Sequence, residues 1–181
     1  MALRNFEFKV RVTNLISLEK KLQEFNPVYI GEDHQVDTYF NVSKGKLKLR
    51  EGNIENALIY YERPDIPDVK QADIILYKHN PESSLKDILS KVHEIKVVVE
   101  KTRKIYFIGN VKFHFDTISD LGTFVEVEAI DETGKIDRQK LKEQCNSYFS
   151  FFGFNRSDYI SRSYSDMILD KVKGIKNTNI Y

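Results

Sequence analysis

The chain has 181 residues, of which 28 are Lys or Arg and 27 are Asp or Glu, so its formal net charge is +1. A chain of this length can bury one proper core but is short for two, so we expect a single domain. The balanced charge excludes a whole-molecule attraction to nucleic acid or to a membrane surface. Any electrostatic function must therefore be local.

Residue types that form disulfides and common metal sites are sparse. Cys145 is the single cysteine, so it cannot form an internal disulfide. The sequence has neither a C-x-x-C pair nor an H-E-x-x-H motif, which leaves carboxylates as ligands for a hard ion such as Mg²⁺ or Mn²⁺. The N-terminus lacks the apolar core of a signal peptide, and no apolar run approaches the roughly 18 residues of a membrane span. We therefore expect a cytoplasmic protein.

Hydrophobic periodicity and turn signals predict about eight strands and about four helices. The first strand lies at residues 5–11, and the helix after it is capped by Asn14 and ended by Asn26-Pro27. Further strands are predicted at 34–41, 45–51, 56–63 and 72–77, a helix at 81–92, strands at 93–107, 110–117 and 122–130, and helices at 141–152 and 158–169. Residues 172–181 are predicted to form a polar, loose tail, which places the domain at residues 1–170 and the tail at 171–181.

Charged side chains recur on one face of most predicted strands, because successive side chains of a strand point to opposite faces. The residues that share a face are Glu7, Lys9 and Arg11; Asp37 and Tyr39; Lys46, Lys48 and Arg50; Lys101 and Arg103; Lys112, His114 and Asp116; and Glu126 and Glu128. One explanation is an antiparallel sheet with a solvated face. The predicted helices, however, need an apolar surface to pack on. The charged faces would then point away from the helices and, in a closed barrel, into the bore.

A bore lined by many Lys and Arg side chains requires an anionic ligand and water, since like charges in a desolvated space cannot all pair with carboxylates. Two carboxylates on one strand face, such as Glu126 and Glu128, can jointly hold a divalent cation. Arg and Lys bind phosphate oxygens, and a metal ion would bridge the carboxylates to the phosphates. The pattern therefore favours a polyphosphate site.

Several segments together resemble a known family. They are N-x-E-x-K at 5–9, H-Q-V-D-T-Y-F at 34–40, K-L-K-L-R-E at 46–51, E-K-x-R at 100–103, D-L-G-x-F-x-E-x-E at 120–128 and R-S-Y at 162–164. In this order they are similar to the CYTH superfamily, which comprises class IV adenylyl cyclases, thiamine triphosphatases and related triphosphate tunnel metalloenzymes. The resemblance covers residues 4–168 and implies an α+β fold, with an eight-stranded antiparallel β-barrel as the triphosphate tunnel and helices packed on its outside.

The resemblance also implies roles for individual residues. The metal ligands, for Mg²⁺ or Mn²⁺, would be Glu7, Asp116, Glu126 and Glu128. The phosphates would contact Lys9, Lys48, Arg50, Arg63, Lys101, Arg103 and Arg162, and the catalytic candidates are Lys9, Tyr39 and Arg63. Two of these have a simpler explanation, because Tyr39 beside Phe40 is also typical of packing, and an arginine such as Arg162 often makes only a surface ion pair.

Two positions depart from the family pattern. Asn5 stands where the signature has its first Glu, which removes one negative ligand and leaves open whether one or two metal ions bind. Arg63 stands where relatives often have Lys. Because an arginine does not lose its proton, proton transfer by a lysine at this position would be missing.

The implied activity is that of a divalent-metal-dependent enzyme acting on a triphosphate, and two reactions are open. Attack of the ribose 3′-oxygen of ATP on the α-phosphorus would give cyclic AMP and pyrophosphate, whereas attack of water on the γ-phosphorus would make the protein a triphosphatase. The segments K-L-K-L-R-E and R-S-Y-S-D look more like class IV cyclases. This analogy favours the cyclase reaction.

Two further classes of protein are alternatives. A non-catalytic module could bind polyphosphate or a nucleotide if Asn5 weakens metal binding. A lipocalin-like barrel would need an apolar bore, which the charged strand faces disfavour. The expected partner is a small-molecule triphosphate such as ATP, thiamine triphosphate or tripolyphosphate, without nucleic acid or membrane, and the chain would be a monomer or a homodimer.

Overall fold

The structure is a computed structural model that describes residues 3–62, 68–81 and 84–178. The strands in this part of the chain are β1 (Leu3–Val12), β2 (Val28–Phe40), β3 (Lys46–Glu51), β4 (Ala57–Glu62), β5 (Lys70–Lys78), β6 (Ile95–Ile108), β7 (Val111–Ile118) and β8 (Gly122–Asp131). The helices described are α1 (Leu15–Leu22), α2 (Leu85–Val92), α3 (Arg138–Phe152) and α4 (Tyr164–Thr178), with short 3₁₀ turns at Gln23–Phe25 and Arg156–Asp158.

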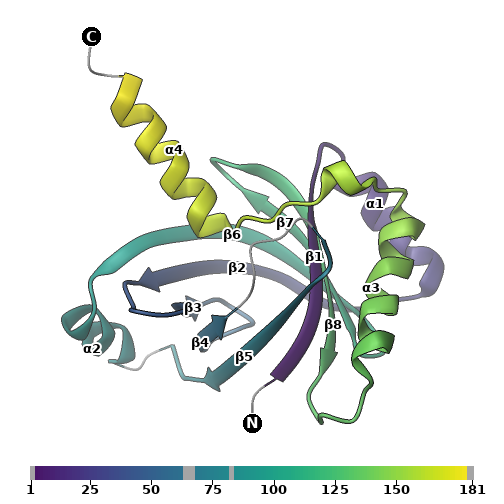
Figure 1. Ribbon diagram of the computed structural model, residues 1–181, viewed down its shortest axis with the longest axis horizontal. Coiled ribbons are helices and arrows are strands. Elements are labelled where there is room, and N and C mark those ends of the chain that lie inside the picture. Colours follow the sequence, from purple (N-terminus) through teal and green to yellow (C-terminus); the bar gives the residue numbers. More distant parts are fainter. Residues whose placement is uncertain (1–2, 63–67, 82–83, 179–181) are drawn as a thin grey trace.

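The eight strands form one antiparallel sheet that closes in a ring, in the order β1-β5-β4-β3-β2-β6-β7-β8 (Figure 1). β1 closes the ring, because it pairs with β5 on one side and with β8 on the other. On the β8 side, Glu7 lies opposite Glu128 and Lys9 lies opposite Glu126. The predicted α+β fold with an eight-stranded antiparallel ring is thereby confirmed, and the charged faces of β1 and β8 lie side by side.

The main apolar core lies outside the ring, between β1, β6, β7 and β8 and the helices α1 and α3 (Figure 1). Phe8 of β1 is fully buried there and meets Phe149 of α3 edge-on, with ring centroids 5.2 Å apart. Because side chains alternate along a strand, burying Phe8 and Val10 against the helix turns Glu7 and Lys9 into the ring. α1 and α3 pack on the outside of the ring, as predicted.

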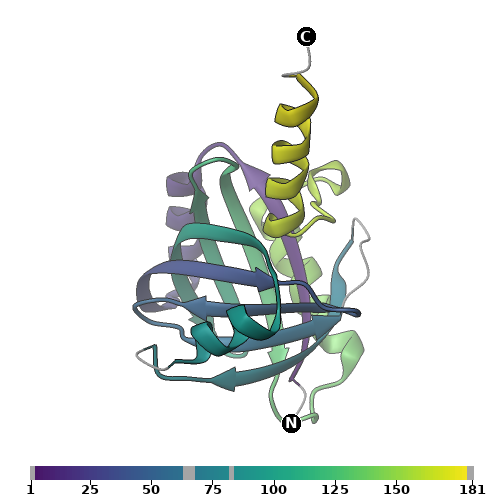
Figure 2. The same ribbon diagram turned by 90° about the vertical axis from the view of Figure 1, so that its left-hand side faces the viewer.

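A second apolar cluster lies at one end of the ring, where α4 begins. Tyr164, the first residue of α4, packs on Phe124 of β8 with ring centroids 5.0 Å apart, and Tyr39 of β2 belongs to the same cluster. From this contact α4 projects beyond the ring (Figure 2). The start of α4 therefore covers one end of the space that the strands enclose.

The C-terminal helix differs from the expectation. A helix was predicted at 158–169, whereas α4 begins at Tyr164 and continues to Thr178, so the expected loose tail is wrong for residues 172–178. The hydroxyl of Ser163 accepts a hydrogen bond from the backbone N–H of Asp166 at 3.3 Å, which caps the helix at this point. The boundary between a domain at 1–170 and a tail stays a prediction.

The starts of two other elements also differ from their predicted positions. β2 begins at Val28, six residues before the predicted start, because residues 28–33 continue the pairing with β6. The register shifts between Tyr29 and Gly31, whose φ of 144° is readily reached only by glycine, and this irregularity hides the strand period in the sequence. α2 begins at Leu85 rather than at Pro81. Among the described residues, no helix combines the length and the apolar character that crossing a bilayer requires.

Candidate functional site

The ring encloses a cavity of about 870 Å³. Most of the predicted site residues line it: Glu7, Lys9, Tyr39, Lys48, Arg50, Lys101, Arg103, Glu126 and Glu128. They come from five different strands, so ring closure brings together charges that are distant in the sequence. The cavity is therefore the candidate functional site.

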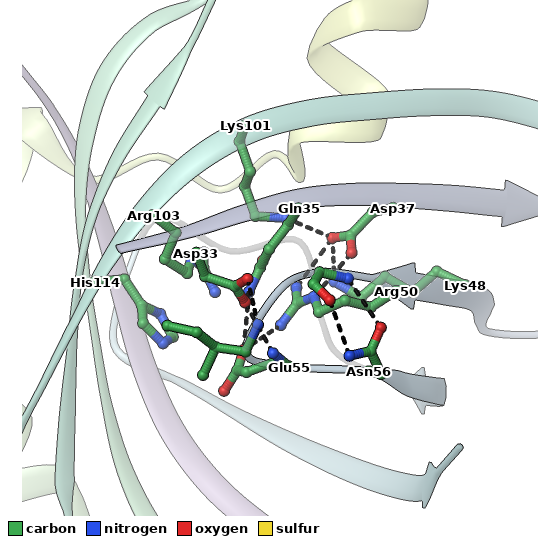
Figure 3. A network of polar contacts seen from close by, with 12 residues as sticks. Asp33, Gln35, Asp37, Lys48, Arg50, Glu55, Asn56, Lys101, Arg103 and His114 are labelled. Atoms are coloured by element: carbon green, nitrogen blue, oxygen red, sulfur yellow. Dashed lines mark hydrogen bonds and ion pairs between the residues drawn. The ribbon is translucent and has the colours of Figure 1, made fainter. Parts of the chain in front are cut away.

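Three cations converge on the carboxylate of Asp37 in β2 (Figure 3). Lys101 Nζ lies 2.7 Å from Asp37 Oδ2, Lys48 Nζ lies 3.0 Å from it, and Arg50 donates to both carboxylate oxygens, with Nε 2.8 Å from Oδ1. Burial alone would raise the pKa of Asp37, but the three cations outweigh it and hold the pKa well below its ordinary value. Because one carboxylate faces three cations, an excess of positive charge remains for an anionic ligand.

A second ion-paired group surrounds Arg103 of β6. Its guanidinium donates to Asp116 with two 2.6 Å contacts and to Glu126 at 2.8 Å. Asp116 also accepts a hydrogen bond from the Tyr164 hydroxyl at 2.7 Å, and Lys9 Nζ lies 3.4 Å from Glu126. Asp116 is fully buried behind the cavity wall, and both of its oxygens are engaged. It therefore orients Arg103 rather than facing the cavity.

His114, Glu126 and Glu128 form a cluster in which three ligand atoms lie within 4.8 Å of one another. His114 Nδ1 lies 3.6 Å from Glu126 and 3.7 Å from Glu128, slightly too far for hydrogen bonds, and neither ring nitrogen has a hydrogen-bond partner although the side chain is buried. Burial and the nearby Arg103 and Lys112 lower the pKa of His114 to about 3, so its ring is neutral at neutral pH. A neutral imidazole with an unused nitrogen beside two carboxylates fits a divalent metal ion.

The two glutamates of this cluster differ in their protonation. Burial and the charge of Glu126 raise the pKa of Glu128 to about 7. For Glu126 burial acts in the same direction, but the charges of Lys9 and Arg103 outweigh it and hold the pKa well below its ordinary value. An excess of negative charge at Glu128 is therefore costly until a cation binds beside it.

Asn5 and Glu7 adjoin this cluster from β1. Asn5 Nδ2 lies 3.5 Å from Glu7 Oε2, whereas Asn5 Oδ1 is buried without a hydrogen-bond partner. An amide oxygen is a ligand for hard cations, although it carries no charge. The site thus keeps an oxygen atom at the position of the missing glutamate but loses the negative charge.

The loop between β3 and β4 places an additional carboxylate among the cations (Figure 3). Glu55 accepts from Arg50 at 3.0 Å, from Gln35 at 3.0 Å and from Lys112. Asp33 fixes this loop by accepting from the backbone N–H groups of Ile54 and Glu55, at 2.8 and 3.0 Å. A Cβ atom on Gly52 would come within 2.6 Å of the Asp33 carboxylate, so glycine at this position permits the close approach.

One predicted phosphate contact does not line the cavity. Arg162 pairs with Asp170 at 2.8 Å, and its side chain is half exposed. Arg63 lies outside the described residues. The strand pattern had placed Asp37, Lys112 and His114 on the correct face without assigning them a role, whereas Glu55 lies in a turn and Tyr164 at a helix start, where no strand period exists to identify them.

Fold and site together define a class of protein in which a closed antiparallel ring holds clustered cations beside carboxylates. The sequence matches the CYTH domain family over residues 3–164, so the chain belongs to the CYTH family, as the resemblance implied. A protein of Methanocaldococcus jannaschii with the name "putative adenylate cyclase" is 23% identical over 171 residues, which are 89% of this chain and 96% of the relative.

Solved structures share the fold. A protein of Pyrococcus horikoshii OT3 superimposes with a TM-score of 0.76 at 22% identity, over 90% of this chain and 98% of its own. A protein of Vibrio parahaemolyticus, also called a "putative adenylate cyclase", gives a TM-score of 0.70 at 18% identity, over 91% and 97% of the two chains. At these identities the likeness concerns the fold.

Proposed function

We propose that this protein is a divalent-metal-dependent enzyme that acts on a triphosphate-containing substrate inside the ring. The observation that carries the proposal is the position of two ion-paired cation groups, around Asp37 and Arg103, beside the His114–Glu126–Glu128 cluster in one cavity. A linear chain of phosphates presents negative oxygens along its length and would contact both cation groups at once. The family match supports this substrate class.

In this proposal the phosphate ligands are Lys9, Lys48, Arg50, Lys101 and Arg103, all of which line the cavity. Glu126, Glu128 and His114 would hold Mg²⁺ or Mn²⁺, with Glu7 and Asn5 adjoining. A bound divalent ion would neutralise phosphate charge and polarise a phosphoryl oxygen. Lys9 lies 3.4 Å from Glu126 and 3.9 Å from the centre of the Tyr164 ring, so an ion pair and a cation–π contact hold it beside the carboxylates.

The other expected roles are retained as narrower proposals. Asp116 acts by orienting Arg103 and Tyr164 rather than as a direct metal ligand. Tyr39 lines the cavity and also belongs to the apolar cluster at the start of α4. Its position is therefore consistent both with a packing role and with a catalytic role. Arg162 would need to leave Asp170 before it could contact phosphate.

The reaction we favour is the cyclase reaction, in which the ribose 3′-oxygen of ATP attacks the α-phosphorus and pyrophosphate leaves. The names of the Methanocaldococcus and Vibrio proteins support this choice. A triphosphatase acting on thiamine triphosphate, a nucleoside triphosphate or tripolyphosphate is the second candidate, because the same cations would bind the same phosphates. A protein that binds polyphosphate without turnover is the third.

Product analysis with ATP separates these candidates. Purified protein is incubated with ATP and Mn²⁺ or Mg²⁺, and the products are resolved by chromatography and mass spectrometry. We expect cyclic AMP and pyrophosphate, at rates reduced at least about 100-fold by Glu126→Gln, since a lost charge-stabilising group in a desolvated site costs on this order. Glu100→Gln is the matched control, because Glu100 is exposed on β6 and does not line the cavity.

The alternative outcomes are equally specific. ADP or AMP without cyclic AMP would reject the cyclase reaction and favour a nucleoside triphosphatase. Metal-dependent phosphate release from thiamine triphosphate or tripolyphosphate alone would identify another triphosphatase. Binding of all three ligands without turnover under either metal would leave a binding protein, and no binding of any triphosphate would reject the proposed function.

A further inference from the structure

One side of the cavity differs from the rest. The cavity-facing side chains of β4 and β5 are Ala57, Ile59, Tyr61, Ala72, Ile74 and Leu76, which are apolar or aromatic, and Lys78 at the last position of β5. In contrast, each of the other strands presents at least one charged side chain to the cavity, from Glu7 on β1 to Glu126 on β8. Apart from Lys78 at the end of β5, the charge is thus confined to the other six strands, and residues 57–61 and 72–76 form an apolar wall on two adjacent strands.

The wall is continuous across the two strands. Ile59 lies opposite Leu76 and Tyr61 lies opposite Ile74 in the antiparallel register. Ile59, Tyr61 and Ala57 are buried, and Ile74 packs against them as one cluster. Leu76 remains 38% exposed although it lines the cavity, so apolar surface is still accessible to a ligand there.

The apolar wall adjoins the cations directly. On the β3 side, Ala57 lies opposite Arg50 and Ile59 lies opposite Lys48, two of the cations that converge on Asp37. A phosphate held by Lys48 and Arg50 would therefore have the wall as its neighbour. Any group attached to that phosphate would lie within reach of Ile59 and Ala57.

An inorganic chain of phosphates gains nothing from such a surface, because every one of its outer atoms is a charged or polar oxygen. An organic group that covers the wall gains free energy, since apolar surface is removed from water. Ala57 and Ala72 have small side chains, which leaves room beside the wall for the ring of an organic group. Tyr61 adds an aromatic surface on which such a ring can pack.

From this segregation of charge we propose that the β4–β5 wall binds the aromatic organic group of the substrate, so that the protein selects organic triphosphate esters over inorganic tripolyphosphate. The inference rests on the proposed function and narrows its substrate class. It applies to the cyclase and to the triphosphatase reaction alike, because it concerns which molecule binds rather than which oxygen attacks.

The test compares ligands that share a triphosphate and differ in the organic group. Binding of ATP, thiamine triphosphate and inorganic tripolyphosphate is measured by calorimetry with Ca²⁺ as the divalent ion. The variant Ile74→Thr/Leu76→Thr makes the wall more polar with a residue that is favourable in strands because it is β-branched. The control is Ile75→Thr/Tyr77→Thr, which makes the same change on the outer face of β5, where these side chains are 58% and 64% exposed.

We expect the unmodified protein to bind ATP or thiamine triphosphate at least about tenfold more tightly than tripolyphosphate, although tripolyphosphate carries more negative charge. The wall variant should lose most of that preference and bind tripolyphosphate within about twofold of the unmodified protein. The outer-face control should keep the preference. Equal binding of all three ligands by the unmodified protein would overturn the inference while leaving the proposed function intact.

Two further results are decisive. A wall variant that weakens organic and inorganic ligands equally would overturn the inference, because the change would then be a general disturbance of the cavity. Failure of every triphosphate to bind the unmodified protein would reject the proposed function and, with it, the role of the wall.

Discussion

Asp37 is the residue on which the cations of β3 and β6 converge, and its position explains how these like charges can lie close together. Lys48, Arg50 and Lys101 repel one another, and burial lowers the pKa of Lys101 well below its ordinary value although Asp37 opposes the shift. Removing one partner from a buried ion-paired group leaves uncompensated charge, which costs far more than a surface ion pair is worth. Asp37 therefore acts as a structural counterion in the absence of a ligand.

We expect Asp37→Asn to lower the free energy of unfolding by about 3 kcal/mol or more, because three buried cations would lose their carboxylate. Tripolyphosphate should restore much of this loss, since it supplies negative charge at the same place. Urea unfolding with and without tripolyphosphate measures both effects. Asp73→Asn, an exposed position on the outer face of β5, should change little, and equal losses for the two variants would contradict the counterion role.

Glu128 makes the opposite prediction, because its folded-state pKa is raised to about 7, above its ordinary value of 4.5. The folded protein then binds this proton more tightly than the unfolded chain does. Its favourable contribution is present below about pH 4.5 and is lost as the pH rises through about 7. In metal-free buffer, Glu128→Gln should therefore be more stable than the unmodified protein at pH 8, by about 3 kcal/mol, and similar to it near pH 4.5.

Urea midpoints at the two pH values, measured in the presence of a chelator, check this expectation. Glu100→Gln supplies the matched comparison, because Glu100 is exposed on β6 and its replacement should give the same small difference at both pH values. A Glu128→Gln protein that is less stable at pH 8 would show that Lys112 or Arg103 already compensates the charge. Stabilisation by this substitution would mean that the cluster is built for a cation rather than for stability.

At the scale of elements, the β3–β4 loop carries a carboxylate that pairs with cations which a phosphate would otherwise contact. Glu55 pairs with Arg50 and Lys112, and these cations outweigh burial to hold the pKa of Glu55 far below its ordinary value. The carboxylate is thus fully charged and competes with an anionic ligand. The Asp33 contacts to the loop backbone keep it in that position.

We expect Glu55→Gln to bind tripolyphosphate about three- to tenfold more tightly, because Arg50 and Lys112 would be released from a competing anion. Calorimetric titration at fixed ionic strength measures the change. Glu51→Gln is the control, since Glu51 pairs with Lys86 of α2 outside the cavity at 2.5 Å. Weaker binding by Glu55→Gln would show instead that the loop organises the cations for the ligand.

Strand alternation predicted which side chains share a face, and the inward set of Lys48, Arg50, Lys101 and Arg103 is as expected. The period of two is a local property, so it can be recognised without knowing the partner strands. It could not decide whether a polar face looks outward or inward, because water and a charged bore select the same residue types. The need of the predicted helices for an apolar surface favoured the inward arrangement, and the resemblance to a family supported it.

Features that depend on contacts formed only in the folded ring were not predicted from the sequence. Arg162 stands next to Ser163 and Tyr164, both of which line the cavity, yet its own side chain turns to Asp170 because α4 starts at this point. The apolar wall could not be predicted from the sequence for another reason. Ile59, Ile74 and Leu76 read as ordinary core residues, and only the ring places them opposite the cations.

At the scale of the whole molecule, the packing is one-sided. α1 and α3 cover the outer faces of β1, β7 and β8, whereas no residue of α2 is buried in the part of the chain that the structure describes. The best-packed strands are those that carry the His114–Glu126–Glu128 cluster, and the apolar wall of β4 and β5 lies on strands that have little helical cover. The carboxylates are thus held on the more rigid part of the ring.

The closure of the ring by β1 has a consequence for biosynthesis. β1 is the first strand to leave the ribosome, but its two neighbours are β5 and β8, and the latter ends only at Asp131. Pairings between segments so far apart in sequence form slowly, since the intervening chain must lose its freedom first. Until they form, the rows of lysine, arginine and glutamate remain hydrated on an open sheet and carry little penalty. We therefore expect the charged faces to become buried late in folding, when β1 pairs with β5 and β8 and the ring closes.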